Sequence, residues 1–347
     1  MQHRLLRWLP AAVAPIVIAG AVTVPLVAAA APPDLPAKSA QQVLELVAKA
    51  KDVRGFSGTV EQRSDLGLPS LPSVGAGSDT DTASALDLIG GDHRARVEVA
   101  GDSRSRIAVL DDGAERDVIR DGDEVWLWSS KANTATRVIA TGDRRPDVQA
   151  PTTTPAALAQ ELLAKVDGTT AVSVDSSQRV AGRDAYTLVL TPRTTATTVG
   201  AVRIAVDAQT GLPLDLSVTA RGASSPAFET GFTDISYAVP AASRFDFTPP
   251  SDAKTTTKRL DAADRPKGAL PAGAKPAVGG SGWASVVTVP SSAVPSDLAS
   301  NPTVRRLTTQ ADGGRVLSTA LVNVLLTDDG RVLAGAVPVA TLEAAAG

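Results

Sequence analysis

The feature that most constrains this chain is a repeated alternation of apolar and polar residues over short segments. Alternation with a period of two places apolar side chains on one face of a β-strand and polar side chains on the other. A sheet built from such strands must cover its apolar face with helices, a second sheet or a ligand. The segments that we expect to form strands include residues 94–99, 106–110, 117–120, 124–128, 136–140, 186–190, 202–206 and 214–218.

Turn and helix signals set the order of these strands. Asp121-Gly122 separates two of the segments and predicts a hairpin, because both residues tolerate a positive φ. Ser39 is suited to cap a helix over residues 39–51, and Thr154-Pro155 is suited to begin a second helix. The predicted order along the chain is therefore helix, strands, helix, strands.

The N-terminus has the pattern of a secretory signal. Arg4 and Arg7 precede an apolar stretch from Trp8 to Ala31, which ends in small residues followed by Pro32-Pro33. We expect residues 1–31 to be a signal peptide cleaved near Ala30-Ala31, and a retained membrane anchor is the alternative. Either outcome places the protein outside the cytoplasm. Because the chain has no cysteine, it has no disulfide and no lipid anchor on an N-terminal cysteine.

Changes in composition divide the mature chain. Residues 37–250 hold both predicted helices and nearly all predicted strands, and we expect them to form the main domain. Residues 251–282 are rich in Lys, Ala, Pro, Gly and Thr, which is typical of a linker. Residues 283–347 then form a small module. The net charge of −3 and the pI of about 5.5 argue against nucleic-acid binding, which favours a basic surface.

Catalytic and metal-binding patterns are weak throughout. His93 is the only histidine of the mature chain, and it follows a Gly-Gly turn. We expect it to lie in a solvated loop and not to act as a catalytic base, because no nucleophile pattern accompanies it. The acidic pairs Asp111-Asp112 and Asp328-Asp329 fall at predicted turns, where Asp is favoured for local backbone reasons. We therefore predict a protein that is not an enzyme, with no catalytic residue, no metal site and no cofactor.

Aromatic residues make up only 3% of the chain, so their positions are informative. Trp126 and Trp128 share one face of a predicted strand, and Phe228 and Phe232 belong to a second aromatic group. Large rigid rings of this kind contact an acyl chain at little entropic cost, although packing in the core is the alternative for both groups. The residues that we expect to line an apolar ligand site are Trp126, Trp128, Tyr186, Leu188, Ile204, Leu216, Phe228 and Phe232.

Four motifs lie in the second half of the main domain. Residues 180–188 have the pattern V-x-G-R-x-x-Y-x-L, and residues 207–214 have the pattern D-x-x-T-G-L-P-L. Residues 228–237 have the pattern F-x-x-G-F-x-D-I-x-Y, and residues 245–250 have the pattern F-x-F-x-P-P. In order and spacing these motifs resemble two strands, a hairpin and the closing segment of the LolA/RseB-like superfamily of bacterial exported proteins.

The resemblance implies a curved antiparallel half-barrel that wraps around helices and encloses an apolar cavity, which is an α+β fold. Residues 283–347, whose own pattern predicts a small α+β module, are an addition that simple carriers of the superfamily lack. Members of the superfamily carry lipoproteins between membranes, or sense mislocalised lipoproteins and restrain an anti-sigma factor.

We expect an exported lipid-binding protein, a carrier of a lipid or of a lipoprotein acyl chain. The alternative is an RseB-like envelope sensor that regulates an anti-sigma factor, or another envelope protein, through residues 283–347. The sequence leaves the ligand, the oligomeric state and the choice between carrier and regulator open.

Overall fold

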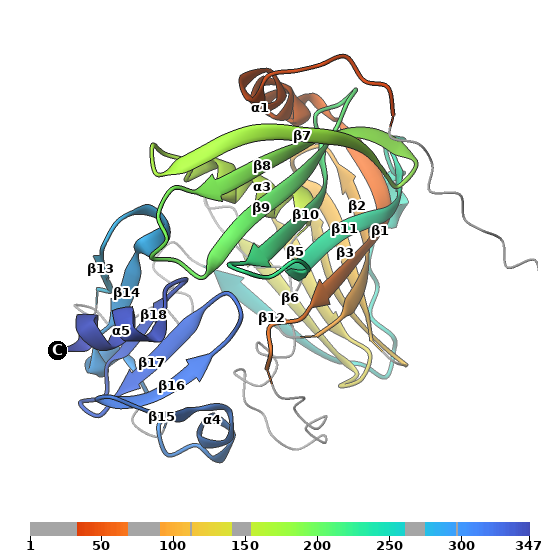
Figure 1. Cartoon of the computed structure of the whole chain (residues 1–347). Helices are drawn as coiled ribbons and strands as arrows, with labels where there is room; N and C mark the ends of the chain where they lie inside the picture. Colours follow the sequence, from red (N-terminus) through yellow and green to blue (C-terminus); the bar gives the residue numbers. More distant parts are fainter. Residues whose placement is uncertain (1–32, 69–90, 112, 141–153, 261–274, 296–297) are drawn as a thin grey trace, which may run out of the picture. The chain divides into compact units, whose positions relative to one another are not determined.

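The chain folds mainly into two β-sheets, as the computed structural model in Figure 1 shows. The structure describes residues 33–68, 91–111, 113–140, 154–260, 275–295 and 298–347, so the expected signal peptide lies outside the described residues. The larger sheet has 12 strands. These strands are β1 (Gly55–Ser64), β2 (His93–Ala100), β3 (Arg104–Asp111), β4 (Ala114–Asp121), β5 (Glu124–Ser129), β6 (Thr134–Ala140), β7 (Thr170–Val180), β8 (Arg183–Pro192), β9 (Val199–Asp207), β10 (Pro213–Ala220), β11 (Pro226–Ser236) and β12 (Lys254–Leu260).

The strand order of the larger sheet is β12-β6-β5-β4-β3-β2-β1-β11-β10-β9-β8-β7. Neighbouring strands run antiparallel except at one edge, where β12 runs parallel to β6. Two sequence expectations are therefore corrected: the sheet is mixed rather than antiparallel, and the protein is mostly β rather than α+β. The strand β12 was missed because it forms from Lys and Thr residues that carry no apolar alternation.

Two short helices cover one face of the larger sheet. Residues that pair directly across neighbouring strands point to the same face, so the register connects Leu188 to Ile204 and Ile204 to Leu216. We call this the covered face. Val43 of α1 (Ala40–Lys49) and Ala159 of α3 (Pro155–Ala164) join these three side chains in one buried cluster. The apolar side of the alternation is thus buried, as the sequence predicts.

Both helices begin at the predicted caps. The Ser39 hydroxyl accepts a hydrogen bond from the Gln42 N–H, and the Gln42 side chain accepts one from the Ser39 N–H, which completes a capping box. Thr154 caps α3 by accepting from the Ala157 N–H, and Pro155 occupies the first turn. These local signals fix where each helix starts, independently of what the helix packs against.

The smaller sheet has 6 strands in the order β13-β14-β18-β17-β16-β15, all antiparallel. Its own core contains Leu325, Leu333 and Leu342, each fully buried. Leu342 belongs to the last helix, which packs on two of the strands. The elements are β13 (Ala277–Gly279), β14 (Val286–Val289), α4 (Pro302–Leu307), β15 (Thr309–Ala311), β16 (Gly314–Ser318), β17 (Asn323–Thr327), β18 (Val332–Gly335) and α5 (Val339–Ala346).

The expected linker, residues 251–282, contains regular structure at both ends. Residues 254–260 form β12 and residues 277–279 form β13, whereas residues 261–274 lie outside the described residues. The domain boundaries proposed from composition stay a prediction. Within the described part of the chain, no helix is long and apolar enough to span a membrane.

Candidate functional site

Six of the eight predicted ligand-lining residues come together on the covered face. Leu188 and Ile204 are fully buried, Leu216 is 1% exposed and Phe232 is 3% exposed. Tyr186 and Phe228 belong to the same face by register. The Tyr186 hydroxyl donates to the carbonyl of Pro36 at 3.0 Å, and the Phe232 ring meets Phe56 edge to face. These side chains therefore pack against α1, α3 and each other.

The remaining two predicted residues lie on the opposite face, which we call the outer face. Trp126 pairs with Ile119, which in turn pairs with Arg106, so these three side chains share the outer face. On the covered face, by contrast, Phe232 pairs with Val60. Trp128 shares the face of Trp126 because the two residues are two positions apart on β5. The structure therefore does not bring all eight residues to one site.

The two tryptophans are contacted by the segment that connects β11 to β12. The Phe247 ring lies 5.4 Å from Trp126 and 5.9 Å from Trp128 between ring centroids, in tilted orientations. Phe245 is 2% exposed and packs beside Trp126 and Ile119. This segment, residues 244–254, is named the strap. The aromatic rings of the strap therefore cover apolar side chains on the outer face of β5.

Polar contacts fasten the strap at its two ends. At one end the Arg244 guanidinium donates to Glu98 at 2.8 Å. At the other end the Asn133 side-chain amide donates to the Asp252 carbonyl at 3.1 Å, and the Lys254 N–H donates to the Asn133 carbonyl at 2.9 Å. These contacts fix the position of the aromatic rings between them. The F-x-F-x-P-P motif thus serves a packing role on the outer face.

Three of the four sequence motifs meet at a buried polar network that the sequence did not predict. Asp207 is fully buried, and the Arg183 guanidinium donates to its carboxylate at 2.8 Å. The Tyr237 hydroxyl donates to the same carboxylate at 3.1 Å and accepts from the Thr210 hydroxyl at 3.0 Å. Arg183 also lies over the Tyr237 ring, 5.1 Å from its centroid. We call this set the Asp207 network.

The Asp207 carboxylate is held in its charged form. Burial by itself favours the neutral form, but hydrogen bonds from Arg183 and from the backbone N–H groups of Thr210 and Gln209 together lower the pKa of Asp207 below its ordinary value. Burial raises the pKa of Tyr237 to about 12, so its hydroxyl remains a donor. The network therefore ties the hairpin between β9 and β10 to the end of β11 and is structural in character.

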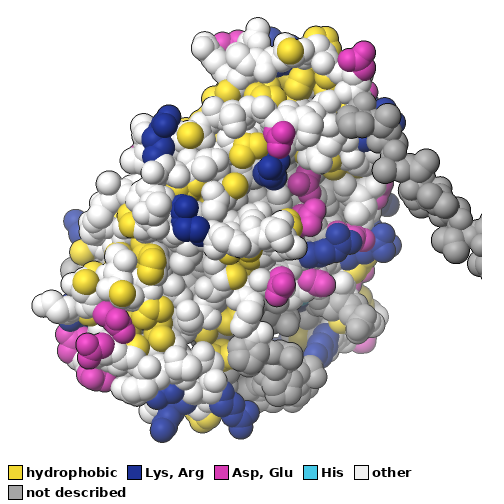
Figure 2. Space-filling view, in the orientation of Figure 1, with side chains coloured by type: hydrophobic (Ala, Val, Ile, Leu, Met, Phe, Trp, Pro, Cys, Tyr) yellow, Lys and Arg dark blue, Asp and Glu magenta, His cyan; other side chains and the backbone are white. Residues whose placement is uncertain are grey.

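Two acidic groups on the outer face, in contrast to Asp207, have a raised pKa. Burial raises the pKa of Asp215 to about 7, and the nearby charge of Glu229 acts in the same direction. Burial and a hydrogen bond with Glu115 raise the pKa of Asp117 to about 7, although Arg106 opposes the shift. Figure 2 shows acidic and basic side chains interspersed over one face of the molecule. Each of these acids therefore lies beside a second carboxyl group, Glu229 for Asp215 and Glu115 for Asp117.

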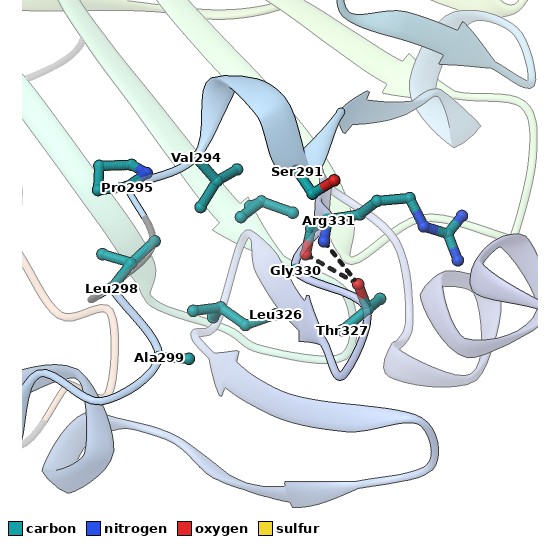
Figure 3. Close-up of a pocket in the computed structure, with 10 residues that line it drawn as sticks. Ser291, Val294, Pro295, Leu298, Ala299, Leu326, Thr327, Gly330 and Arg331 are labelled. Carbon is teal, nitrogen blue, oxygen red and sulfur yellow. Dashed lines mark hydrogen bonds between the residues drawn. The ribbon is translucent and has the colours of Figure 1, made fainter.

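One pocket lies between the helices that cover the larger sheet, and another lies in the smaller sheet. The first, of 310 Å³, has Leu44, Val47 and Leu163 in its wall and Lys51 beside them. The second, of 230 Å³, is lined by Val294, Pro295, Leu298, Leu326 and Val332, among others. In Figure 3 the Arg331 side chain of this second pocket points away from the leucines.

The described residues contain no group of three or more His, Asp or Glu side chains placed to hold a metal ion. His93, which we expected in a loop, begins strand β2. It pairs across the sheet with Gln62 of β1.

Most strands of the larger sheet, and Arg183, Asp207 and Thr210 of the Asp207 network, lie within a segment that is similar to a known family. Residues 89–225 match the family model of the MucB/RseB N-terminal domain. The resemblance inferred from the sequence motifs is therefore confirmed for that segment. The match spans β2 to β10 and includes the motifs at residues 180–188 and 207–214, whereas α1, β1, β11, the strap and the smaller sheet lie outside it.

Solved structures give weaker similarities. The structure of MucB in complex with MucA(peri) is 19% identical over 88% of this chain and 96% of that chain, with a TM-score of 0.45. The MucA/MucB complex of Pseudomonas aeruginosa gives 19% identity over 88% and 96%, with a TM-score of 0.44. A LolA superfamily protein from Nitrosomonas europaea gives 14% identity over 61% and 99%, with a TM-score of 0.25. No curated protein matches the chain.

Proposed function

We propose that this chain is an extracytoplasmic, non-enzymatic regulator of the RseB type, which restrains an envelope anti-sigma factor through protein contacts. The observation that carries the proposal is the match of residues 89–225 to the MucB/RseB N-terminal domain. The expected role as a lipoprotein carrier is less well supported, because the chain adds a second folded sheet to the LolA-like part.

The smaller sheet offers a place for the partner. Its 230 Å³ pocket is walled by aliphatic side chains, including Leu298 and Leu326, and is open at the surface. A pocket of this kind accepts an apolar anchor residue from a partner segment, and such anchors dominate the free energy of binding at protein interfaces. We infer that an apolar side chain of the anti-sigma factor occupies it.

Binding to the extracytoplasmic segment of the anti-sigma factor encoded in the same genome tests this proposal. Isothermal titration should give a measurable dissociation constant for the full exported chain. Leu298→Asp should weaken binding at least 10-fold, because it places a charge in an apolar pocket, which corresponds to about 1.4 kcal/mol or more. Val239→Asp is the control, because Val239 is 55% exposed and lies outside the pocket, and it should bind normally. A wild-type chain that binds no such segment would contradict the proposal.

Acyl-chain binding is a second candidate function. The observation that favours it is the 310 Å³ pocket between α1 and α3, whose wall of Leu44, Val47 and Leu163 is joined by the charged Lys51. This volume lies at the lower end of the range for small-molecule sites. A fatty acid would place its tail against the leucines and its carboxylate near Lys51. Native mass spectrometry of the exported chain should then show co-purifying lipid, and a chain free of lipid in membrane-derived preparations would argue against it.

A further inference from the structure

The tip of the hairpin between β16 and β17 has a fixed shape. The Thr319 hydroxyl accepts from the Val322 N–H at 2.9 Å and donates to the Val322 carbonyl at 2.6 Å. The Thr319 N–H donates to the same carbonyl at 3.1 Å. These bonds fix the orientation of two adjacent apolar side chains. Leu321 is buried, with 8% of its surface exposed, whereas Val322 is 41% exposed.

Leu321 is buried against the larger sheet rather than against its own. It belongs to the buried cluster of the covered face, together with Val199 and Val202 of β9. The adjacent Ala320 N–H donates to the Leu66 carbonyl at 2.9 Å, and the Ala320 side chain packs on the same cluster. The tip is therefore both hydrogen-bonded and inserted at one end of the covered face.

The loop between β8 and β9 receives the tip. The Arg221 guanidinium donates to the carbonyls of Thr194, Thr197 and Val199 at 2.8, 2.9 and 3.1 Å, which holds the loop in one conformation. From this loop the Thr198 hydroxyl donates to the Leu321 carbonyl. The Thr197 hydroxyl and the Thr198 N–H also donate to the carbonyl of Ala336, which directly follows β18, at 2.6 and 3.0 Å. The loop is therefore held by the larger sheet and by the end of β18, and none of these bonds involves the hairpin tip.

We propose that the hairpin tip, residues 319–322, is a detachable latch, in which Leu321 closes one end of the covered face and its withdrawal admits an acyl chain there. Detachment leaves both folds intact, because the smaller sheet keeps its own core of Leu325, Leu333 and Leu342. Withdrawal of the tip breaks the packing of Leu321 and Ala320 on the cluster and the two hydrogen bonds of the tip with Leu66 and Thr198. The latch rests on the second candidate function, since it supplies a route for the acyl chain.

Thiol labelling of single-cysteine variants tests whether the tip is seated and whether it moves. The chain has no cysteine, so an introduced thiol is the only one present. Leu321→Cys should react at least 10-fold more slowly with a maleimide than the matched control Val322→Cys. The labelling rate of a buried thiol depends on the fraction of molecules in which the tip is detached and the thiol is exposed. Adding cis-parinaric acid, a fluorescent fatty acid, should raise the Leu321→Cys rate several-fold and leave the Val322→Cys rate unchanged. Equal rates for the two variants without the fatty acid would overturn the latch.

A disulfide provides a second test that keeps Leu321. The hydrogen bond between Ala320 and Leu66 brings the two backbones close enough for a disulfide, and both side chains pack on the same cluster. The oxidised Leu66→Cys/Ala320→Cys chain should bind cis-parinaric acid at least 10-fold more weakly than the same chain after reduction. Equal binding in the two states overturns the latch and leaves acyl binding standing. An absence of binding in wild-type and reduced chains overturns both the latch and the acyl-binding function.

Discussion

Gly211→Ala should lower the free energy of unfolding by about 4 kcal/mol, among the largest effects expected for a single substitution here. Gly211 has a φ of +77°, which costs an ordinary residue about 1–2 kcal/mol. A Cβ at this position would also lie 1.9 Å from the Leu46 carbonyl oxygen. Because that oxygen belongs to the backbone of α1, the clash can be relieved only by moving the helix off the covered face.

Gly222→Ala is the matched control for this experiment. Gly222 has nearly the same φ, +81°, but a Cβ there would meet no atom within 4 Å. It should therefore lose only about 1–2 kcal/mol, the cost of the backbone conformation. Guanidinium unfolding of the full exported chain would measure both variants. Equal losses of unfolding free energy in the two variants would show that α1 can move at little cost and is not held against the hairpin between β9 and β10.

Arg183→Ala should lower the free energy of unfolding by about 3–5 kcal/mol at neutral pH, because it leaves the buried carboxylate of Asp207 without its cation. Arg203→Ala is the control. The ion pair of Arg203 with Asp175 has a similar length, 2.6 Å, but both side chains are 47% exposed. Solvent screens such a pair, so its loss should cost less than about 1 kcal/mol.

The pH dependence of the Arg183→Ala effect follows from the lowered pKa of Asp207. A carboxyl whose pKa is lower in the folded state than in the unfolded state stabilises the fold above its unfolded pKa, about 3.9. This contribution is lost as the pH falls through the lower, folded value. The difference between wild type and Arg183→Ala should therefore be full at pH 7 and should shrink below about pH 4. A difference independent of pH would assign the loss to packing instead of charge.

The sequence by itself determined the local structure of this protein. The alternation of apolar and polar residues predicts the strands β2 to β6 and β8 to β10, whereas β7 was not predicted. The caps Ser39 and Thr154 predict where α1 and α3 begin. Each of these signals involves residues only a few positions apart, so it can be recognised without information about the rest of the fold. For the same reason the motifs were sufficient to identify the MucB/RseB-like segment.

Only the tertiary structure decided which segment covers which apolar face. Both faces of β5 are apolar, and alternation cannot say that Phe247 of the strap, rather than a ligand, contacts Trp126 and Trp128. Likewise, the sequence marks Arg183, Asp207 and Tyr237 as parts of separate motifs but does not bring them together. Contacts between residues far apart in the chain depend on strand order and register, which set the direction of every side chain at once. The local pattern of the chain therefore specified the helices and strands. The long-range pairing of strands specified the Asp207 network, the position of the strap and the burial of Leu321 in the cluster of the covered face.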